Sequence, residues 1–322
     1  MLIPRFWAEA RHRRVIDGRQ WTIRRFGWSD ESLPVAQSKA EARVEEAFLQ
    51  VTSGMKPSRR ERKVPYNGAD GVPIREEVIA RCDEAVVTRN SYGSLCLNTP
   101  NVLFVDIDLN EGTPWKWFVR VGFATAILAL AIQILFPGMY LVWLSVFFVP
   151  AWITSRLYAV FMKLKGGNRE IAMARIRQFS NDHPDWCLRV YETPLGYRVL
   201  VMHTTFEPHG HDVAQCFDAL GCDPVYVAMC RVQRCFRARV SPKPWRAGMS
   251  TPMLPRGAVW PLTPEKMEVR QSWIHAYEQR AADYAACRFV THLGSDQVHP
   301  SAEAVRRWHD ELSRAESGLP TA

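Results

Sequence analysis

The run Val102-Leu-Phe-Val-Asp-Ile-Asp108 is the most β-like stretch of the chain, and an unusually apolar segment follows it. The 322 residues include 47% hydrophobic side chains, and the 12 Trp and 15 Phe require a packed interior. This composition excludes a disordered, collagenous or coiled-coil chain. The net charge of +8 and the mean hydropathy of -0.19 are typical of a soluble protein, so the apolar segment stands out.

The apolar segment extends from Val121 to Ser155, 35 consecutive residues without Asp, Glu, Lys or Arg. A helix that spans a bilayer needs roughly 20 apolar residues, so the segment is too long for one span and long enough for two. Pro137-Gly138 near its middle favours a turn. The sequence therefore predicts a transmembrane hairpin with helices over Phe118–Phe136 and Met139–Tyr158.

Basic residues flank the apolar segment on both sides: Lys116 and Arg120 precede it, and Arg156, Lys163 and Lys165 follow it. The positive-inside rule places both flanks in the cytoplasm. Because the first residues contain no apolar signal-peptide core, we expect an inner-membrane protein with two spans and both termini cytoplasmic. Two alternatives stay open: a buried helical hairpin in a soluble core and a re-entrant hairpin in one leaflet.

Strand and helix patterns alternate on either side of the apolar segment. From residue 102 the predicted order is β-α-β-β-α-β, with strand 102–108, helix 169–179, strands 188–191 and 197–202, helix 212–220 and strand 225–229. This is the split βαβ arrangement of ferredoxin-like and RNA-recognition-motif folds, so we expect an α+β domain interrupted by the membrane hairpin. The predicted parts are 1–116 and 161–262 for this domain, 117–160 for the hairpin and 263–322 for C-terminal helices.

Two carboxylates end the β-like run. Asp106 and Asp108 are separated by one residue, so their side chains share one face of a strand and can converge on one divalent cation, Mg²⁺ or Mn²⁺. The alternative is a strand that simply ends in a solvated loop, because a polar Asn-Glu-Gly-Thr-Pro sequence follows soon afterwards.

A basic segment lies in the second half of the chain. From Pro224 to Pro264 there are 41 residues without Asp or Glu. The cations of this segment that we predict to bind phosphate are Arg231, Arg234, Arg237, Arg239 and Lys243. Guanidinium groups among aromatic rings are typical of a surface that binds a polyanion. The alternatives are internal pairing of these arginines with acids and contact with anionic lipid headgroups.

A hydrophobic strand that ends in Asp106 and Asp108, then a helix, then the hairpin Thr193-Pro-Leu-Gly196, resembles the palm of the archaeo-eukaryotic primase-polymerase superfamily. The resemblance covers roughly residues 100–240 and implies divalent metal at the two carboxylates. It also implies a phosphate contact after the hairpin, where Arg198 stands in place of the family's His. The family's later carboxylate has no counterpart in the acid-free segment, so the resemblance implies a degenerate site.

These features predict a membrane-anchored, cytosol-facing protein that binds a phosphate-rich ligand, a nucleotide or nucleic acid. The alternative is a non-enzymatic membrane scaffold that contacts anionic lipid or an acidic partner protein. Whether the protein is an enzyme stays open, since the sequence has no GxGxxG, Walker A, HExxH or GxSxG motif. The eight Cys form no CxxC pair and are interpreted as buried thiols, and His309-Asp310 as a solvated helix face.

Overall fold

The computed structural model describes residues 1–64, 68–69, 71–109, 115–138, 152, 154, 156, 158–160, 166–255 and 260–322. The chain divides into two compact units. The first contains Met1–Ile107 and Phe179–Ala322, and the second contains Asp108–Gln178.

The first unit begins with a long antiparallel ribbon and a helix. The elements are β1 (Phe6–Ile16), β2 (Arg19–Ser29) and α1 (Leu33–Thr52), and the register runs from Phe6↔Ser29 to Ile16↔Arg19. The tight turn between the strands needs positive φ, which Asp17 (φ 50) and Gly18 (φ 69) supply. Ser32 caps α1 by accepting a hydrogen bond from the Val35 backbone N–H.

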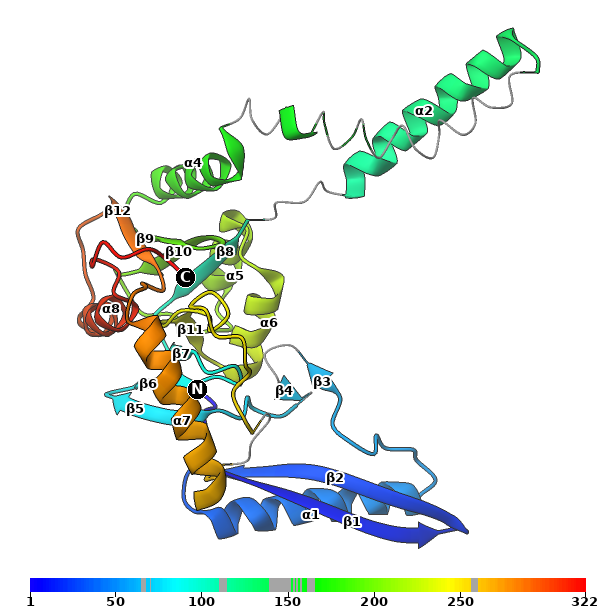
Figure 1. Cartoon of the computed structure of the whole chain (residues 1–322), viewed down its shortest axis with the longest axis vertical. Coiled ribbons are helices and arrows are strands. Elements are labelled where there is room, and N and C mark those ends of the chain that lie inside the picture. The colour runs from blue at the N-terminus through cyan, green and yellow to red at the C-terminus, as the bar shows by residue number, and fades with distance from the viewer. Residues whose placement is uncertain are drawn as a thin grey trace. The chain divides into compact units, whose positions relative to one another are not determined.

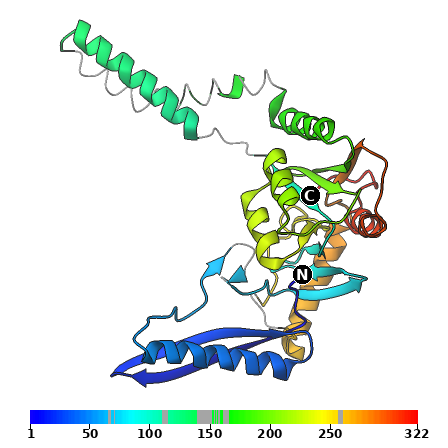
Figure 2. The same cartoon turned by 180° about the vertical axis from the view of Figure 1, so that it is seen from behind.

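Helix α1 covers one face of this ribbon and lies behind it in Figure 1 and in front of it in Figure 2. Ile23 of β2 and Val44 and Phe48 of α1 belong to one buried apolar cluster. The backbones approach so closely at Gly27 that a Cβ there would lie 2.1 Å from the Ala36 carbonyl oxygen. On the opposite face, at the end of the ribbon where β1 begins and β2 ends, Trp7 and Phe26 pack with Val72 and Trp260.

A four-stranded sheet with the order β11-β7-β6-β5 follows in the same unit. Its strands are β5 (Glu77–Cys82), β6 (Ala85–Arg89), β7 (Leu95–Thr99) and β11 (Phe236–Arg239). The strand pairs β11–β7, β7–β6 and β6–β5 are all antiparallel. The short strands β3 (Lys63–Val64) and β4 (Gly68–Ala69) form a separate pair.

A second four-stranded sheet has the order β12-β9-β10-β8. Its strands are β8 (Phe104–Asp108), β9 (Cys187–Thr193), β10 (Gly196–Val201) and β12 (Arg288–Gly294). Three of these correspond to predicted strands of the split βαβ unit. The fourth predicted strand, 225–229, is wrong because these residues belong to helix α6 (Pro224–Gln233). Asp223 caps that helix by accepting from the Val225 and Tyr226 backbone N–H groups, so local capping overrides the β-branched composition.

The fold is therefore α+β, while the complete ferredoxin-like sheet is not confirmed, since β12 occupies an edge that the sequence did not predict. The remaining helices of the first unit are α5 (His211–Leu220), α7 (Pro264–Ala281) and α8 (Pro300–Ser313), and α4 (Gly167–Asp182) crosses the boundary between the units. In Figures 1 and 2, α6 and α8 lie on opposite flanks of the two sheets.

Helix α2 (Trp115–Leu135) belongs to the second unit. Trp117–Leu135 has a mean hydropathy of 2.1, and only 6% of its most apolar window is buried. Among the described residues it is the one helix long and apolar enough to cross a membrane, so one span is supported weakly and by composition only. The predicted second helix, Met139–Tyr158, falls mostly outside the described residues, and the two-helix hairpin is not shown.

Candidate anion-binding site

The predicted carboxylate pair lies at the end of β8. The Asp106 side chain is 27% exposed, and its Oδ1 accepts a hydrogen bond from Nη2 of Arg198 on β10 at 3.2 Å. Asp108 is exposed. Within the described part of the chain, no group of three His, Cys, Asp or Glu residues is arranged to hold a metal ion. A cation at Asp106 would also face the Arg198 guanidinium, so these two residues alone make a poor donor set, and the metal site stays a prediction.

Arg198 is buried and connects the two sheets. Its Nη1 donates to the carbonyl oxygen of Arg239 on β11 at 2.8 Å and lies 3.5 Å from Nε2 of His309 on α8. Burial lowers the pKa of the guanidinium, but Asp106, Cys287 and Tyr226 together outweigh it and the pKa is raised. Arg198 is therefore a permanent internal cation, and a phosphate could reach it only in competition with Asp106.

The interpretation of His309-Asp310 as a solvated helix face is wrong, because the His309 side chain is fully buried. His309 Nδ1 lies 3.0 Å from Asp310 Oδ1, and its Nε2 lies 3.8 Å from the Cys287 sulfur. The Tyr191 hydroxyl donates to Asp310 at 2.6 Å. The order thiol–imidazole–carboxylate is that of a nucleophilic triad. Because Cys287 is also fully buried, no substrate can reach the sulfur in this conformation.

Arg237 of β11 faces the protein interior. Its Nη2 donates to both oxygens of Glu76 at 2.7 and 2.6 Å, and both side chains are at most 7% exposed. The Thr88 hydroxyl donates to the same carboxylate at 2.7 Å. Burial lowers the pKa of Arg237, while Cys96 and Glu76 raise it well above its ordinary value. Arg237 is therefore paired internally with an acid, which was one of the two alternatives to phosphate binding for the arginines of the basic segment.

The other predicted phosphate ligands are more accessible. Arg231 and Arg234 are exposed at the C-terminal end of α6. Arg239 is half-buried, and its Nε has no hydrogen-bond partner. The Lys243 ammonium lies 5.6 Å from the centre of the exposed Trp245 ring, which contacts Tyr92 edge-on at 5.2 Å. The structure thus places the six predicted ligands in different environments rather than in one site.

Sequence reasoning missed the largest set of accessible cations, which lies on the ribbon and on the loop after α1. We define the arginine-rich ribbon as the exposed cations of these segments: Arg11, Arg13, Arg19, Lys56, Arg59, Arg60 and Arg62. The loop runs along β2, since the Arg24 backbone N–H donates to the Arg59 carbonyl oxygen at 3.0 Å. In the part of the chain that the structure describes, no ion pair joins these cations to a carboxylate.

Two acids lie close to these cations and are already engaged. Glu45 of α1 is held by Arg14 and by His12, and Glu61 by Arg43 at 3.0 Å. The seven arginines within the first 25 residues, against Glu9 and Asp17, are the sequence signal for this surface. The comparisons with known proteins add no constraint: no family model, curated protein or solved structure matches the chain.

Proposed function

We propose that this protein binds a phosphate-rich polymer, a nucleic acid, through the arginine-rich ribbon. The observation that carries the proposal is the contrast in pairing: the ribbon's cations are exposed and have no carboxylate partner among the described residues, whereas Arg198 and Arg237 are held internally. Exposed guanidinium groups bind phosphate oxygens in forked geometry and release counterions from the polymer on contact.

The shape of the ribbon fits a double helix. Two antiparallel strands of 11 residues each extend roughly 35 Å. The major groove of B-form DNA admits a two-stranded ribbon, and beyond Phe26 the face opposite α1 is not covered by any described residue. Arg11 lies beside Arg24 on that face by register, so guanidinium groups project from both strands, and that of Arg24 lies 3.5 Å from Glu9. We therefore expect duplex DNA to bind better than single-stranded RNA.

The cations predicted from the second half of the chain form a second phosphate-binding group in this proposal. Arg231, Arg234, Arg239 and Lys243 would contribute directly, since the first two are exposed and Lys243 lies near an aromatic ring. Arg198 and Arg237 would have to exchange a carboxylate for a phosphate. We therefore expect smaller effects on binding from these two than from the ribbon.

The proposal also includes anchoring of this protein in a membrane. Helix α2 is long and apolar enough to span a bilayer, and basic residues flank its sequence. We propose the two-span hairpin, with both termini and the arginine-rich ribbon on the cytoplasmic side. The palm-like arrangement of β8, β9 and β10, with Mg²⁺ at Asp106 and Asp108, is the accompanying proposal for a nucleotide. Isothermal titration with Mg²⁺ and a nucleoside triphosphate, beside the Asp106→Asn/Asp108→Asn variant, tests it separately.

The deciding experiment measures anisotropy of a fluorescent 25-base-pair DNA with the detergent-solubilised full chain at 50 and 200 mM salt. The variant replaces Arg11, Arg13, Arg59 and Arg60 by Ala. A matched control removes four exposed arginines elsewhere, Arg177, Arg280, Arg288 and Arg307. Both variants lose the same charge, but Arg288 and Arg307 of the control pair with Glu192 and Glu303, so a difference between the variants reports the position and the pairing of the charges.

We expect the ribbon variant to bind at least tenfold more weakly at 50 mM salt. The slope of log K against log salt should fall by about 3–4 if four phosphate contacts are lost. The control variant should stay within about twofold of the unmodified protein. Equal losses in the two variants would reduce the effect to net charge, and binding only to anionic vesicles would favour the membrane-scaffold alternative.

A further inference from the structure

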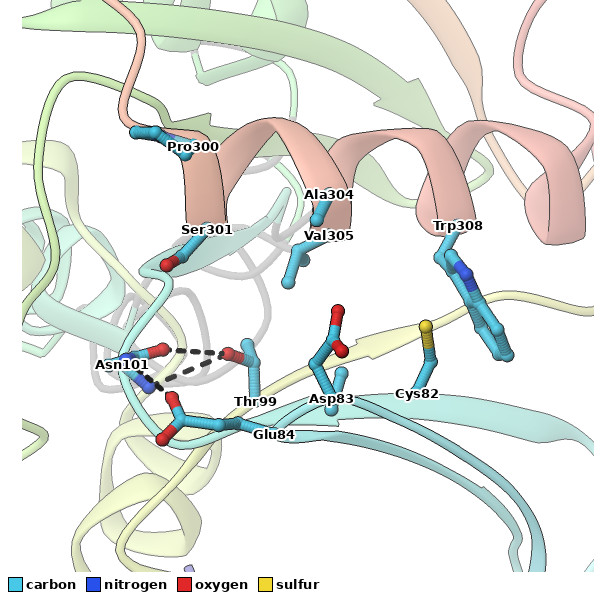
Figure 3. A pocket seen from close by; sticks show the side chains of 11 residues that line it. Cys82, Asp83, Glu84, Thr99, Asn101, Pro300, Ser301, Ala304, Val305 and Trp308 are labelled. Carbon is cyan, nitrogen blue, oxygen red and sulfur yellow. Dashed lines mark hydrogen bonds between the residues drawn. The ribbon is translucent and has the colours of Figure 1, made fainter.

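A cavity of about 330 Å³ lies between the β5–β6 turn and helix α8, far in sequence from the arginine-rich ribbon. Figure 3 shows its walls: Asp83 and Glu84 come from the turn, Thr99 and Asn101 from the end of β7, and the α8 side chains face them across the opening. A volume of this size suits a small organic molecule. All of these residues belong to the first unit, so one packed body forms the cavity.

The charged side chains that line the cavity are both acidic, although the chain as a whole carries +8. Glu84 accepts a hydrogen bond from the Asn101 side-chain amide at 2.9 Å, which holds it at the floor. The Asp83 carboxylate points toward α8 in Figure 3. Asp83 has φ 50, a conformation that Asp tolerates in a turn.

The opposite wall is apolar. Pro300, Ala304 and Val305 of α8 line it, and the Trp308 indole closes one end beside Cys82. The Ser301 hydroxyl is the polar group of this wall in Figure 3. An indole next to carboxylates favours a ligand with a positive charge and an apolar body, because both groups attract an ammonium while the aliphatic side chains shelter carbon atoms.

The N-terminus of a helix attracts anions, but the N-terminus of α8 does not make the cavity an anion-binding site. The His299 Nδ1 already accepts the Ser301 backbone N–H at 3.2 Å. Glu303 supplies a carboxylate in the first turn, where Arg306 pairs with it at 2.7 Å. An anion in the cavity would meet Asp83 and Glu84 without a cationic side chain among the lining residues. The charge of the cavity therefore selects cations.

We propose that the cavity between the β5–β6 turn and α8 binds an organic ammonium ion with a flat or aliphatic body. Asp83 binds the ammonium group, and Trp308 with Val305 packs against the carbon skeleton. Glu84 adds negative potential at the cavity wall, and its hydrogen bond with the Asn101 amide holds it in place. This site is independent of nucleic-acid binding by the ribbon, and a ligand here would reach the protein whether or not the ribbon is occupied.

The test uses isothermal titration of the full chain in detergent with phenethylammonium chloride, and with 2-phenylethanol as the uncharged analogue of similar size. The variant is Asp83→Asn, which removes the charge and keeps a side chain that tolerates positive φ. Asp17→Asn is the matched control, since Asp17 has the same φ of 50 in the β1–β2 turn. A second variant, Trp308→Leu, removes the indole.

We expect phenethylammonium to bind at least tenfold more tightly than 2-phenylethanol, with the preference lost in Asp83→Asn and kept in Asp17→Asn. Trp308→Leu should weaken the ammonium probe several-fold. Thermal unfolding of each variant checks that the fold is retained. Equal affinity for the two probes, unchanged binding in Asp83→Asn, or no binding of phenethylammonium to the unmodified protein would overturn the proposal.

Discussion

Arginine occupies two opposite environments in this protein, buried in the sheets and exposed on the ribbon. The comparison shows that the residue type alone does not decide whether an arginine is available to a ligand. In the sheets, Arg198 and Arg237 are 3% and 7% exposed, and each donates to a carboxylate. On the ribbon, Arg11 and Arg13 are exposed and form no ion pair with the described residues. A buried cation needs a partner because desolvation is costly, whereas an exposed one stays available to a ligand.

The difference follows from the number of layers around each strand. Strand β11 is one edge of a four-stranded sheet in a packed body, and Phe236, Arg237 and Ala238 are all buried. The β1–β2 ribbon has a helix on one face only, and beyond the Trp7 cluster its other face has no cover in the described structure. The following changes test whether these two roles of arginine are separate.

The largest effect is expected for Arg237→Ala. The change leaves the Glu76 carboxylate buried without its cation, which costs about 3–5 kcal/mol of unfolding free energy. Urea unfolding of the detergent-solubilised protein, followed by circular dichroism, measures it. The double variant Arg237→Met/Glu76→Gln should recover part of the loss. A cost of Arg237→Ala below about 1 kcal/mol would mean that the pair is not the buried contact described here.

The second change, Gly27→Ala, tests how tightly α1 seals its face of the ribbon. The added methyl would lie 2.1 Å from the Ala36 oxygen and 2.3 Å from the Ala40 nitrogen, so helix and strand must separate. We expect a loss of about 1–3 kcal/mol in the same urea measurement. Gly54→Ala is the comparison. A Cβ at Gly54 would meet no atom within 4 Å, so this substitution carries only the backbone strain of a φ of 84. A smaller loss for Gly27→Ala than for Gly54→Ala would contradict the close packing.

A third change, His309→Gln, addresses the polar network behind Arg198. Burial lowers the pKa of His309, but Cys287 and the hydrogen bond with Asp310 outweigh the effect of burial, and the pKa is raised. The other polar neighbours of His309 are Tyr191 and Arg198. A raised pKa contributes stability that is fully present below the unfolded value of 6.5 and is lost as pH rises through the folded value.

The variant should therefore lose about 1 kcal/mol relative to the unmodified protein near pH 6, and less at pH 9. Unfolding free energies of both proteins at the two pH values measure this difference. A gap that widens toward pH 9 would contradict the raised pKa of His309. Arg307→Gln, on the exposed face of the same helix, should show a gap that does not change over this range.

The smallest effect on stability is expected for Arg11→Ala/Arg13→Ala. Both side chains are exposed, so the unfolding free energy should change by no more than about 0.5 kcal/mol. The same variant should weaken DNA binding several-fold and reduce its salt dependence. Stability loss comparable to that of Arg237→Ala would show that the ribbon arginines have structural partners, and the contrast between the regions would fail.

Local signals predicted most of the elements correctly. The predicted strand 102–108 and helices 169–179 and 212–220 correspond to β8, α4 and α5, and Thr193-Pro-Leu-Gly196 predicted the β9–β10 turn. The segment 225–229 was predicted wrongly because β-branched residues were weighed above the Asp223-Pro224 helix start. Strand β12 was not predicted, since its exposed and half-buried residues alternate without a strong apolar pattern.

The candidate site was less predictable than the fold. The sequence grouped Arg237 with the phosphate ligands, but it could not show that this arginine pairs with Glu76, 161 residues away. The same limit applies to Asp106 and Arg198, and to His309, whose neighbours Phe104, Tyr191, Arg198 and Cys287 come from four other segments. Long-range contacts of this kind have no periodic signature in the chain.

The sequence by itself determined the α+β character, the apolar helix, the free thiols and the excess of basic residues, because each depends on composition or local spacing. Only the tertiary structure decided which of the basic residues are available to a ligand. Burial and pairing are properties of the assembled sheets, and a guanidinium takes a carboxylate from another strand wherever packing removes it from water. Arg11 and Arg13 stay exposed because no described residue packs over the outer face of the ribbon beyond Phe26.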